Sequence, residues 1–243
     1  MILFRQLLIL LCVLSIGACK EDYSYPNVLT ELTEVQTDGN GMMKTLTTDR
    51  GEAFTIAKCA QAVKLTADSL YRMLTVFEPL EGSNNHLLLH AAQPVFSEYP
   101  IPVDKFEDNI KTDPVDIQSI WRSGNYLNMI LHVQTKDKKH EFHFVENGIY
   151  PYELPKGGTN TKEGTNTKEG TNSKEGSFAG DEGRQMLEIS LYHDRKDDYE
   201  AFTSKYCFSI PLKRYEGKLK KGDVIRLNLN TYKEGNTYRD FEF

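Results

Sequence analysis

Short segments in which apolar and polar residues alternate recur along this chain every 8 to 15 residues, and they constrain its fold more than any other feature. Alternation with a period of two is typical of strands that bury one face, whereas an amphipathic helix needs a period of about 3.6, which no segment sustains. The 13 Tyr and 12 Phe residues also suit strands better than helices. The sequence therefore predicts an all-β protein.

The first block of alternating segments occupies residues 27–100, where turns rich in Gly, Asn and Asp separate the segments. Five strands in about 70 residues is the size of a small closed barrel, in which closure leaves no exposed strand edge. The sequence therefore predicts a small N-terminal OB-like barrel. Its expected strands are 28–37, 44–48, 53–58, 69–80 and 86–96.

A proline-rich stretch separates this block from a second one. Three prolines between Tyr99 and Pro114 interrupt the alternation and predict a linker over residues 101–115. Seven further segments follow in residues 116–243, and two sheets packed face to face as a β-sandwich would accommodate them. The expected strands are 116–122, 126–135, 140–145, 185–193, 206–211, 224–231 and 238–243.

A tandem six-residue repeat spans Thr159–Gly176 inside the second block, with Thr-Asn-Thr-Lys-Glu-Gly as its first two copies. It has no apolar residue to bury, so we expect a disordered low-complexity insertion over residues 156–182. A repeat expansion would be tolerated there because a longer loop adds little closure entropy. A role as a spacer or a variable surface tag is the alternative.

The N-terminal segment indicates where the protein acts. Residues 1–18 carry one basic residue, Arg5, and then an apolar stretch of about half the roughly 20 residues that cross a bilayer, as in a cleavable signal peptide. Ile16-Gly17-Ala18-Cys19 resembles the lipobox of bacterial lipoproteins. That resemblance implies that Cys19 is the lipidated first residue of the mature chain and that residues 19–26 form its tether. Two or more lipid chains attach a protein stably to a membrane.

Three charged residues, Lys20, Glu21 and Asp22, follow Cys19 directly. They look like the tag with which Bacteroidota send lipoproteins to the outer face of the outer membrane. We therefore expect a surface-exposed outer-membrane protein that is held by the lipid on Cys19. Charge also suits any solvated tether, so a periplasm-facing orientation stays open.

The charge balance disfavours one class of partner. Residues 1–18 contain one basic and no acidic residue, so the net charge changes from −6 to −7 when they are removed. Phosphate binding needs a basic footprint, so we expect no nucleic-acid partner. Residues 20–103, which include the predicted barrel, hold 6 basic and 11 acidic residues. A glycan, peptide or protein ligand therefore suits the barrel better than an oligonucleotide.

No residue pattern predicts a metal or cofactor site. On a strand, His86 and His90 would lie about 13 Å apart, too far to share a metal ion. His140 and His143 would point to opposite faces, whereas Glu141 and His143 would share a face, as is common on solvated strands. Two further residues, Cys59 and Cys207, lie in different predicted domains, and we expect buried thiols there rather than a disulfide.

Catalytic motifs are also missing, and we predict no catalytic residue. The acidic run His193–Asp198 lacks the Gly and the closing Glu of an EF-hand loop, so we interpret it as a hairpin loop. Ser123, Ser190 and Ser209 follow no nucleophile motif, although a triad assembled in space stays open. The single tryptophan, Trp121, is expected in the core rather than as a platform for a sugar.

Several segments together resemble the NigD-like lipoproteins of Bacteroidota. The resemblance implies an N-terminal OB-like barrel joined to a C-terminal β-sandwich, and it carries over no activity, cofactor or catalytic residue. The family name links it to bacteriocin production or immunity. The segments that carry the resemblance are the lipobox at Cys19, Tyr25–Leu32, Leu46–Asp49, His193-Asp194 and Phe208–Leu212.

These observations together predict a non-enzymatic, lipid-anchored envelope protein. Its two β domains would act as a binding or interaction module for a glycan, a peptide or a protein. One alternative is a surface hydrolase that acts on a glycan or a peptide. The other alternative is a bacteriocin-immunity or envelope-protection protein.

Overall fold

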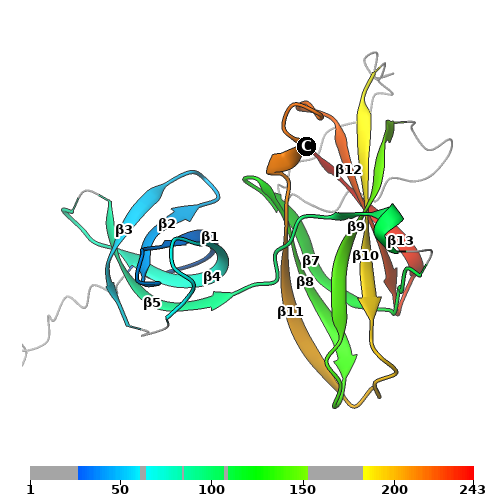
Figure 1. The fold of residues 1–243 in the computed structure, drawn as a ribbon, viewed down its shortest axis with the longest axis horizontal. Coiled ribbons are helices and arrows are strands. Elements are labelled where there is room, and N and C mark those ends of the chain that lie inside the picture. Colours follow the sequence, from blue (N-terminus) through cyan, green and yellow to red (C-terminus); the bar gives the residue numbers. More distant parts are fainter. Residues whose placement is uncertain (1–26, 61–63, 84, 107–108, 153–182) are drawn as a thin grey trace, which may run out of the picture.

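The computed structural model describes residues 27–60, 64–83, 85–106, 109–152 and 183–243, and these form two β domains in succession (Figure 1). The all-β class, with a small barrel followed by a sandwich, is confirmed. The predicted signal peptide, the lipobox, the charged tag and the repeat lie outside the described residues. Within the described part, no helix has the length and apolar character needed to span a bilayer.

Five strands close into the N-terminal barrel in the order β1-β2-β3-β5-β4. Strand β1 pairs with both β2 and β4, and the parallel pairing of β3 with β5 completes the circle. Because side chains alternate across each strand, Val35, Leu46 and Phe77 point inward and are fully buried. The strands are β1 (Leu29–Thr37), β2 (Met43–Thr48), β3 (Ala53–Cys59), β4 (Leu70–Pro79) and β5 (His86–Pro94).

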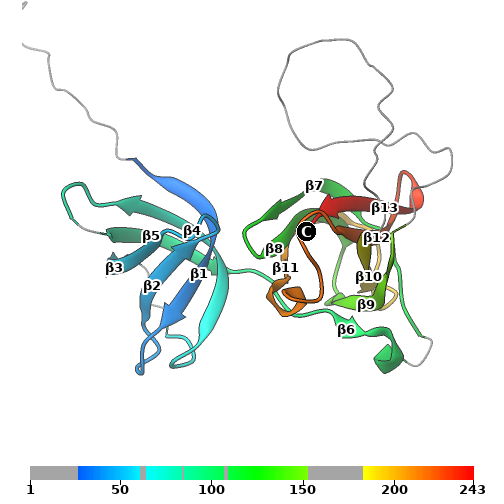
Figure 2. The same ribbon diagram turned by 90° about the horizontal axis from the view of Figure 1, so that it is seen from above.

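The C-terminal domain packs a five-stranded sheet, β13-β12-β10-β9-β6, on a three-stranded sheet, β11-β8-β7. The three-stranded sheet lies on the side of the barrel, and the five-stranded sheet lies beyond it (Figure 2). Leu131, Phe144, Ile189 and Leu227 are fully buried in the core that the two sheets share. The elements are β6 (Ile101–Pro102), η2 (Val103–Phe106), β7 (Asp116–Ser123), β8 (Tyr126–Thr135), β9 (Glu141–Pro151), β10 (Gln185–Asp194), β11 (Phe202–Pro211), η3 (Lys213–Tyr215), β12 (Val224–Thr231) and β13 (Gly235–Glu242).

The proline-rich stretch 101–115 lies along the sandwich. Ile101 pairs with Val145 at the edge of the five-stranded sheet, and the 3-10 turn η2 follows. Residues 109–115, which we call the strap, then pair with two other strands of the same sheet. Proline prevents a long ladder here because it lacks an N–H donor, but isolated pairings remain possible.

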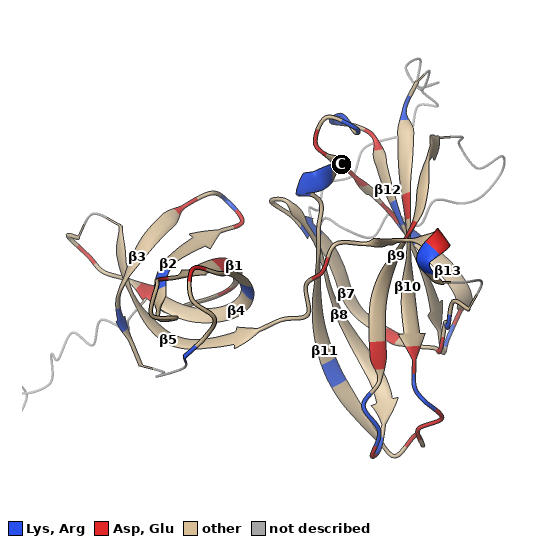
Figure 3. Cartoon of the chain, in the orientation of Figure 1, with Lys and Arg blue, Asp and Glu red and all other residues tan. Residues whose placement is uncertain are grey.

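The acidic run 193–198 does not form the predicted hairpin loop. Strand β10 belongs to the five-stranded sheet and β11 to the three-stranded sheet, so residues 195–201 cross from one sheet to the other. Charged residues of both signs gather in this loop and in the neighbouring β8–β9 turn (Figure 3). The charged composition of residues 193–198 therefore predicts a loop between two strands, but it does not show that the strands belong to different sheets.

A buried arginine connects the barrel to the sandwich. The side chain of Arg72 on β4 is 2% exposed, and its two terminal nitrogens donate to both carboxylate oxygens of Asp49 at 2.6 and 2.8 Å. From the sandwich, Ser209 Oγ accepts a hydrogen bond from Arg72 Nε at 3.0 Å, and Asn128 Oδ1 accepts one at 3.1 Å. One guanidinium group thus binds the barrel turn and two sandwich strands together.

Two further contacts surround this guanidinium group. The ring centroid of Tyr126 lies 3.8 Å from the Arg72 guanidinium carbon, and the Tyr126 hydroxyl donates to Glu34 on β1 at 2.6 Å. Burial, together with the Glu34 carboxylate, raises the pKa of Tyr126. Gly124 has a φ of +52°, and a Cβ there would lie 2.7 Å from the Asp49 carbonyl oxygen. The β7–β8 turn therefore sits directly on the β2–β3 turn.

Candidate functional site

A hollow of about 350 Å³ opens on the five-stranded sheet. It lies where β10 and β12 separate, because their parallel pairing ends at Ser190 and Asn228. Beyond that point the strap occupies the space between the two strands, pairing with β10 through Thr112 and with β12 through Val115. The hollow is thus a fork between two parallel strands that the strap closes at one end.

Seven of the nine residues that line the hollow are polar and uncharged, although apolar atoms form most of its exposed wall. Asn228 and Asn230 point to the outer face because Leu227 and Leu229, which alternate with them, are buried in the core. Amide and hydroxyl groups can both donate and accept hydrogen bonds. The lining residues are Thr112, Ser190, Leu191, Asn228, Leu229, Asn230, Asn236, Thr237 and Tyr238.

Hydrogen bonds hold the polar side chains of the hollow in place. Asn228 Nδ2 donates to Glu188 Oε1 at 2.9 Å, and Asn230 Nδ2 donates to the Thr112 carbonyl oxygen at 2.7 Å. Ser190 Oγ accepts a hydrogen bond from Asn147 Nδ2 at 2.7 Å. These bonds fix the orientation of both amide groups before any ligand arrives, which lowers the entropy cost of binding.

An aromatic ring forms part of the rim. Tyr238 on β13 is 43% exposed, and the guanidinium carbon of Arg226 lies 4.0 Å from its ring centroid. Arg226 is held in turn by two hydrogen bonds of 2.8 Å to the carboxylate of Asp240. A cation fixed over a ring by an ion pair restricts the ring to one orientation. The hollow therefore has a pre-organised aromatic wall.

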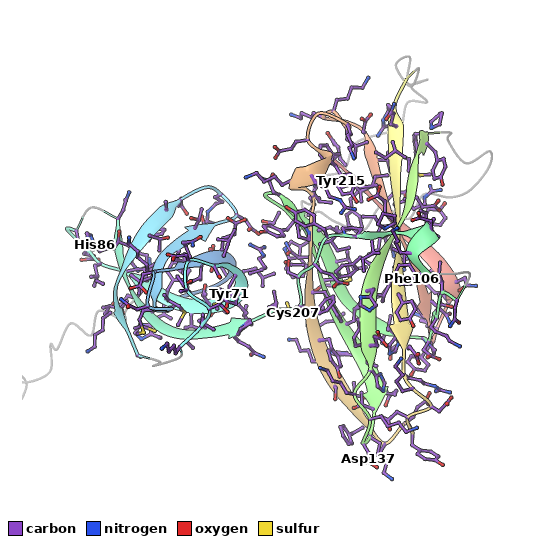
Figure 4. The ribbon with its side chains drawn as sticks, viewed as in Figure 1. Tyr71, His86, Phe106, Asp137, Cys207 and Tyr215 are labelled. Atoms are coloured by element: carbon purple, nitrogen blue, oxygen red, sulfur yellow. The ribbon has the colours of Figure 1, made fainter. Side chains whose placement is uncertain are left out.

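A second cluster lies on the same sheet, where η2 packs on β9 and β10. The ring centroid of Phe106 lies 5.4 Å from that of Tyr192 and 6.1 Å from that of His143 (Figure 4). His143 is bound by Glu98 at 2.8 Å and by Glu141 at 3.2 Å. Burial lowers the pKa of His143, but the two carboxylates outweigh burial and raise the pKa above its usual value. The prediction that Glu141 and His143 share a face is confirmed.

Two buried histidines form a network near the loop that joins β10 to β11. His193 Nδ1 donates to the Asp113 carbonyl oxygen at 2.9 Å, so its Nε2 accepts from His140 Nδ1, also at 2.9 Å. His140 Nε2 lies 3.3 Å from Asp198, whose carboxylate accepts two backbone N–H groups of the β8–β9 turn. Burial lowers the pKa of His193. Burial raises the pKa of Asp198, but the backbone hydrogen bonds outweigh it and lower this pKa well below its usual range.

The serines considered as nucleophiles lie apart from one another and have separate surroundings. Ser209 belongs to the domain junction, Ser190 lines the hollow, and Ser123 is the last residue of β7. His86 and His90 both lie on β5, as predicted, and His90 Nε2 is 3.2 Å from Glu78. Within the described ranges, no group of three His, Cys, Asp or Glu residues could hold a metal ion.

The remaining residues considered from the sequence have ordinary structural positions. Cys59 lies in the barrel and Cys207 in the sandwich, and the two are not bonded to each other. Burial raises the pKa of Cys207, which Figure 4 places on the side of the sandwich nearest the barrel. Trp121 lies on β7, half-buried and outside the core cluster, so the expectation of a core position was wrong.

Comparison with known proteins identifies the C-terminal domain. The family model described as "NigD-like C-terminal beta sandwich domain" matches residues 99–154 and 159–243. A search of curated protein sequences found no match. The matched residues begin before β6 and include the strap, the hollow and the histidine network.

Solved structures match both domains together. A NigD-like immunity protein from Bacteroides caccae is 26% identical, with a TM-score of 0.64 over 91% of this chain and 99% of that one. A candidate toxin-related protein from Parabacteroides distasonis is 15% identical, with a TM-score of 0.60 over 89% and 93% of the two chains. A candidate lipoprotein from Bacteroides fragilis is 14% identical, with a TM-score of 0.53 over 89% and 97%. The family match covers more than half of the chain, and we conclude that this protein belongs to the NigD-like family.

Proposed function

We propose that this protein is a non-enzymatic, lipid-anchored envelope protein that binds a ligand on the outer face of its sandwich. The observation that carries the proposal is the hollow at the β10–β12 fork, where three strands and the strap supply uncharged polar residues and one fixed ring. Concave sites with a few oriented polar groups are the usual form of a ligand site. Because Arg72 bonds both Asp49 in the barrel and Ser209 in the sandwich, the two domains would move as one unit when the sandwich meets its ligand.

The lipid anchor is supported by the sequence. The lipobox ends at Cys19, and two acyl chains on that residue would hold the protein stably, at about 0.8 kcal/mol for each buried methylene. The description of the Bacteroides fragilis structure as a candidate lipoprotein agrees with this part of the proposal. An anchored protein with a preformed site could retain its ligand at the cell envelope.

Binding accounts for the carboxylates beside the hollow better than hydrolysis does. A glycosidase needs two carboxyl groups that face the scissile bond across a cleft. Glu188 instead accepts a hydrogen bond from Asn228, and Asp240 is paired with Arg226. Both carboxylates therefore support side chains of the hollow, which is a role in positioning.

The proposal is tested in two steps, anchoring and capture. Cys19→Ala, expressed with an ordinary cleavable signal peptide in place of residues 1–18, should move the protein from the membrane fraction to the soluble fraction, because the acyl chains attach to that thiol and no apolar signal peptide remains. The wild-type protein, purified from its native membrane in mild detergent, should co-purify with the same glycan, peptide or protein in repeated preparations. Membrane retention of the Cys19→Ala variant would contradict the anchor, and preparations without any reproducible companion would contradict the binding role.

Replacing Lys20, Glu21 and Asp22 by alanine should abolish labelling by a protease or antibody that is added to intact cells. The reason is that these charges would direct the lipoprotein to the outer face of the outer membrane, while the lipid alone would keep it in the membrane. A matched control replaces Tyr23, Ser24 and Tyr25 by alanine and should stay labelled. Equal labelling of both variants would contradict surface export through this tag.

A role in immunity is the second candidate, and the similarity to a NigD-like immunity protein favours it. Such a protein would bind a toxin or the target of a toxin at the envelope. Deletion of the gene should then increase sensitivity to at least one member of a bacteriocin panel, and expression in trans should restore resistance. Unchanged sensitivity to the whole panel would remove this candidate and leave the binding proposal in place.

A further inference from the structure

We infer that the hollow at the β10–β12 fork binds one unit of a neutral oligosaccharide, with Tyr238 as the surface on which the sugar ring stacks. This inference rests on the proposed function and names the ligand class for the same site. Four properties carry it: the charge of the lining, the kinds of polar group, the position on the sheet and the fixed ring.

The lining favours a ligand without charge. No lining residue is charged, and of the charged neighbours Arg226 is paired with Asp240, while Glu188 accepts a hydrogen bond from the neutral amide of Asn228. A phosphate, sulfate or carboxylate group would leave water without a partner of opposite charge, and burying an unpaired charge is strongly unfavourable. The site therefore disfavours anionic glycans and phosphorylated ligands.

The polar groups suit hydroxyl-rich ligands. Three asparagines, two threonines and Ser190 are among the residues that line the hollow. An amide offers an acceptor oxygen and a donor nitrogen side by side, and neighbouring hydroxyls on a sugar ring can donate to one and accept from the other. Asn228 Nδ2 already donates to Glu188 and Ser190, and Asn230 Nδ2 donates to the Thr112 carbonyl oxygen, so Asn228 presents its acceptor oxygen and both amides have fixed directions.

The position of the hollow favours a sugar over an extended peptide. A peptide added to a sheet needs a free strand edge and pockets for alternate side chains. The hollow lies instead on the face of the sheet, because Ser190, Asn228 and Tyr238 line it from outward positions of three neighbouring strands. Leu191 and Leu229, the aliphatic residues of the lining, belong to the buried core and are 3% and 4% exposed, so neither leucine offers an apolar peptide side chain much surface.

Tyr238 supplies the apolar part of the recognition. Its ring is 43% exposed and held by Arg226, so it can stack on the C–H face of a sugar without losing further freedom. A volume of about 350 Å³ is near the small end of ligand sites, which span about 300–1,000 Å³. The hollow therefore fits one sugar ring, and binding at this single site should be weak.

The test is a nuclear magnetic resonance titration of the mature chain, residues 19–243, made with Cys19→Ser so that it carries no lipid. The probes are neutral gluco-, manno-, xylo- and galacto-oligosaccharides, with oligogalacturonate as the anionic probe and a polyglycine-serine peptide as the neutral peptide. At least one neutral sugar should shift the side-chain amide signals of Asn228, Asn230 and Asn236. Oligogalacturonate and the peptide should leave these signals unchanged.

Two variants and a matched control connect binding to the hollow. Tyr238→Ala should weaken binding about five- to tenfold, the value expected for one stacked ring. Asn236→Ala, at an exposed rim position, should weaken it about threefold. Tyr199→Ala is the control, because Tyr199 is also exposed and also lies beneath a cation, Lys136, but belongs to the β10–β11 loop. It should bind like the wild type.

The outcomes separate the ligand class from the proposed function. Any one of three results would overturn the sugar site. No neutral sugar shifts the signals, the anionic probe or the peptide binds better than the sugars, or Tyr238→Ala binds as tightly as the wild type. If the Tyr238→Ala variant still co-purifies with the same membrane companion, the protein binds that companion through a surface other than the hollow, and the proposed binding function is retained. If the wild type binds a sugar in the titration but has no companion in the membrane, the sugar site stands and the proposed function fails.

Discussion

Replacing Arg72 by alanine should lower the free energy of unfolding by about 3–5 kcal/mol, the usual cost of removing one partner of a buried ion pair. The change leaves the Asp49 carboxylate, whose side chain is 13% exposed, without its cation. It also removes the guanidinium N–H groups that donate hydrogen bonds to Ser209 and Asn128 in the sandwich. Urea unfolding followed by far-UV circular dichroism would measure the loss. Small-angle scattering would show whether the domains separate.

The matched control for this variant is Arg50→Ala. Arg50 also pairs with two carboxylates of the barrel, Glu31 and Glu52, but its side chain is 64% exposed. Exposed ion pairs contribute little because water already solvates both charges. The control should therefore unfold at nearly the same urea concentration as the wild type. Equal midpoints for Arg72→Ala and Arg50→Ala would show that Arg72 does not hold the domains together.

The free energy of unfolding should reach a maximum near pH 6.5 within the range from pH 5 to 8. Burial lowers the pKa of His193 below its usual 6.5, so between that lowered value and 6.5 the unfolded chain binds the extra proton and stability falls as the pH falls. His143 acts in the opposite direction, because its pKa is raised in the folded protein. Above pH 6.5 the folded protein keeps that proton, so stability falls as the pH rises through the raised value.

Two variants assign the two sides of this maximum. His193→Gln should flatten the acid side, whose slope is at most about 1.4 kcal/mol per pH unit for one proton. His143→Gln should flatten the alkaline side, which is shallower because solvent screens a side chain that is 27% exposed. Urea midpoints at half-unit pH intervals would measure both slopes. A curve that rises steadily from pH 5 to 8 would contradict the opposed shifts.

Strand positions were readable from the sequence because alternation is a local property. The barrel strands lie within a few residues of their predicted bounds, and β8 and β12 coincide with theirs. Strand β6 was not predicted, because two residues between prolines cannot show a period. The sequence also did not predict that the loop after β10 leads to the other sheet, because the sheet to which a strand belongs depends on pairing partners far along the chain.

Neither the hollow nor the contact between the two domains at Arg72 could be predicted from local sequence patterns. Arg72 looks like an outward-facing position of an alternating strand, and only contact with Asp49 and Ser209 makes it a buried connector. Thr112 belongs to a stretch whose prolines predict a linker, yet it closes the hollow. One signal was present: Asp49 and Ser209 both lie in segments that carry the family resemblance, and they meet at the same guanidinium group.

The junction at Arg72 also implies an order of assembly. A chain made from its N-terminus completes the barrel strands long before Ser209, which lies 137 residues after Arg72. The barrel can close early, since its pairings all lie between Leu29 and Pro94 and domains generally fold as units. Until β8 is in place the guanidinium group has its barrel partner only, and its contact with Ser209 waits for β11. Docking of the two domains should therefore be the last step of maturation, and a chain truncated before β11 would keep a folded barrel with an unfinished contact surface.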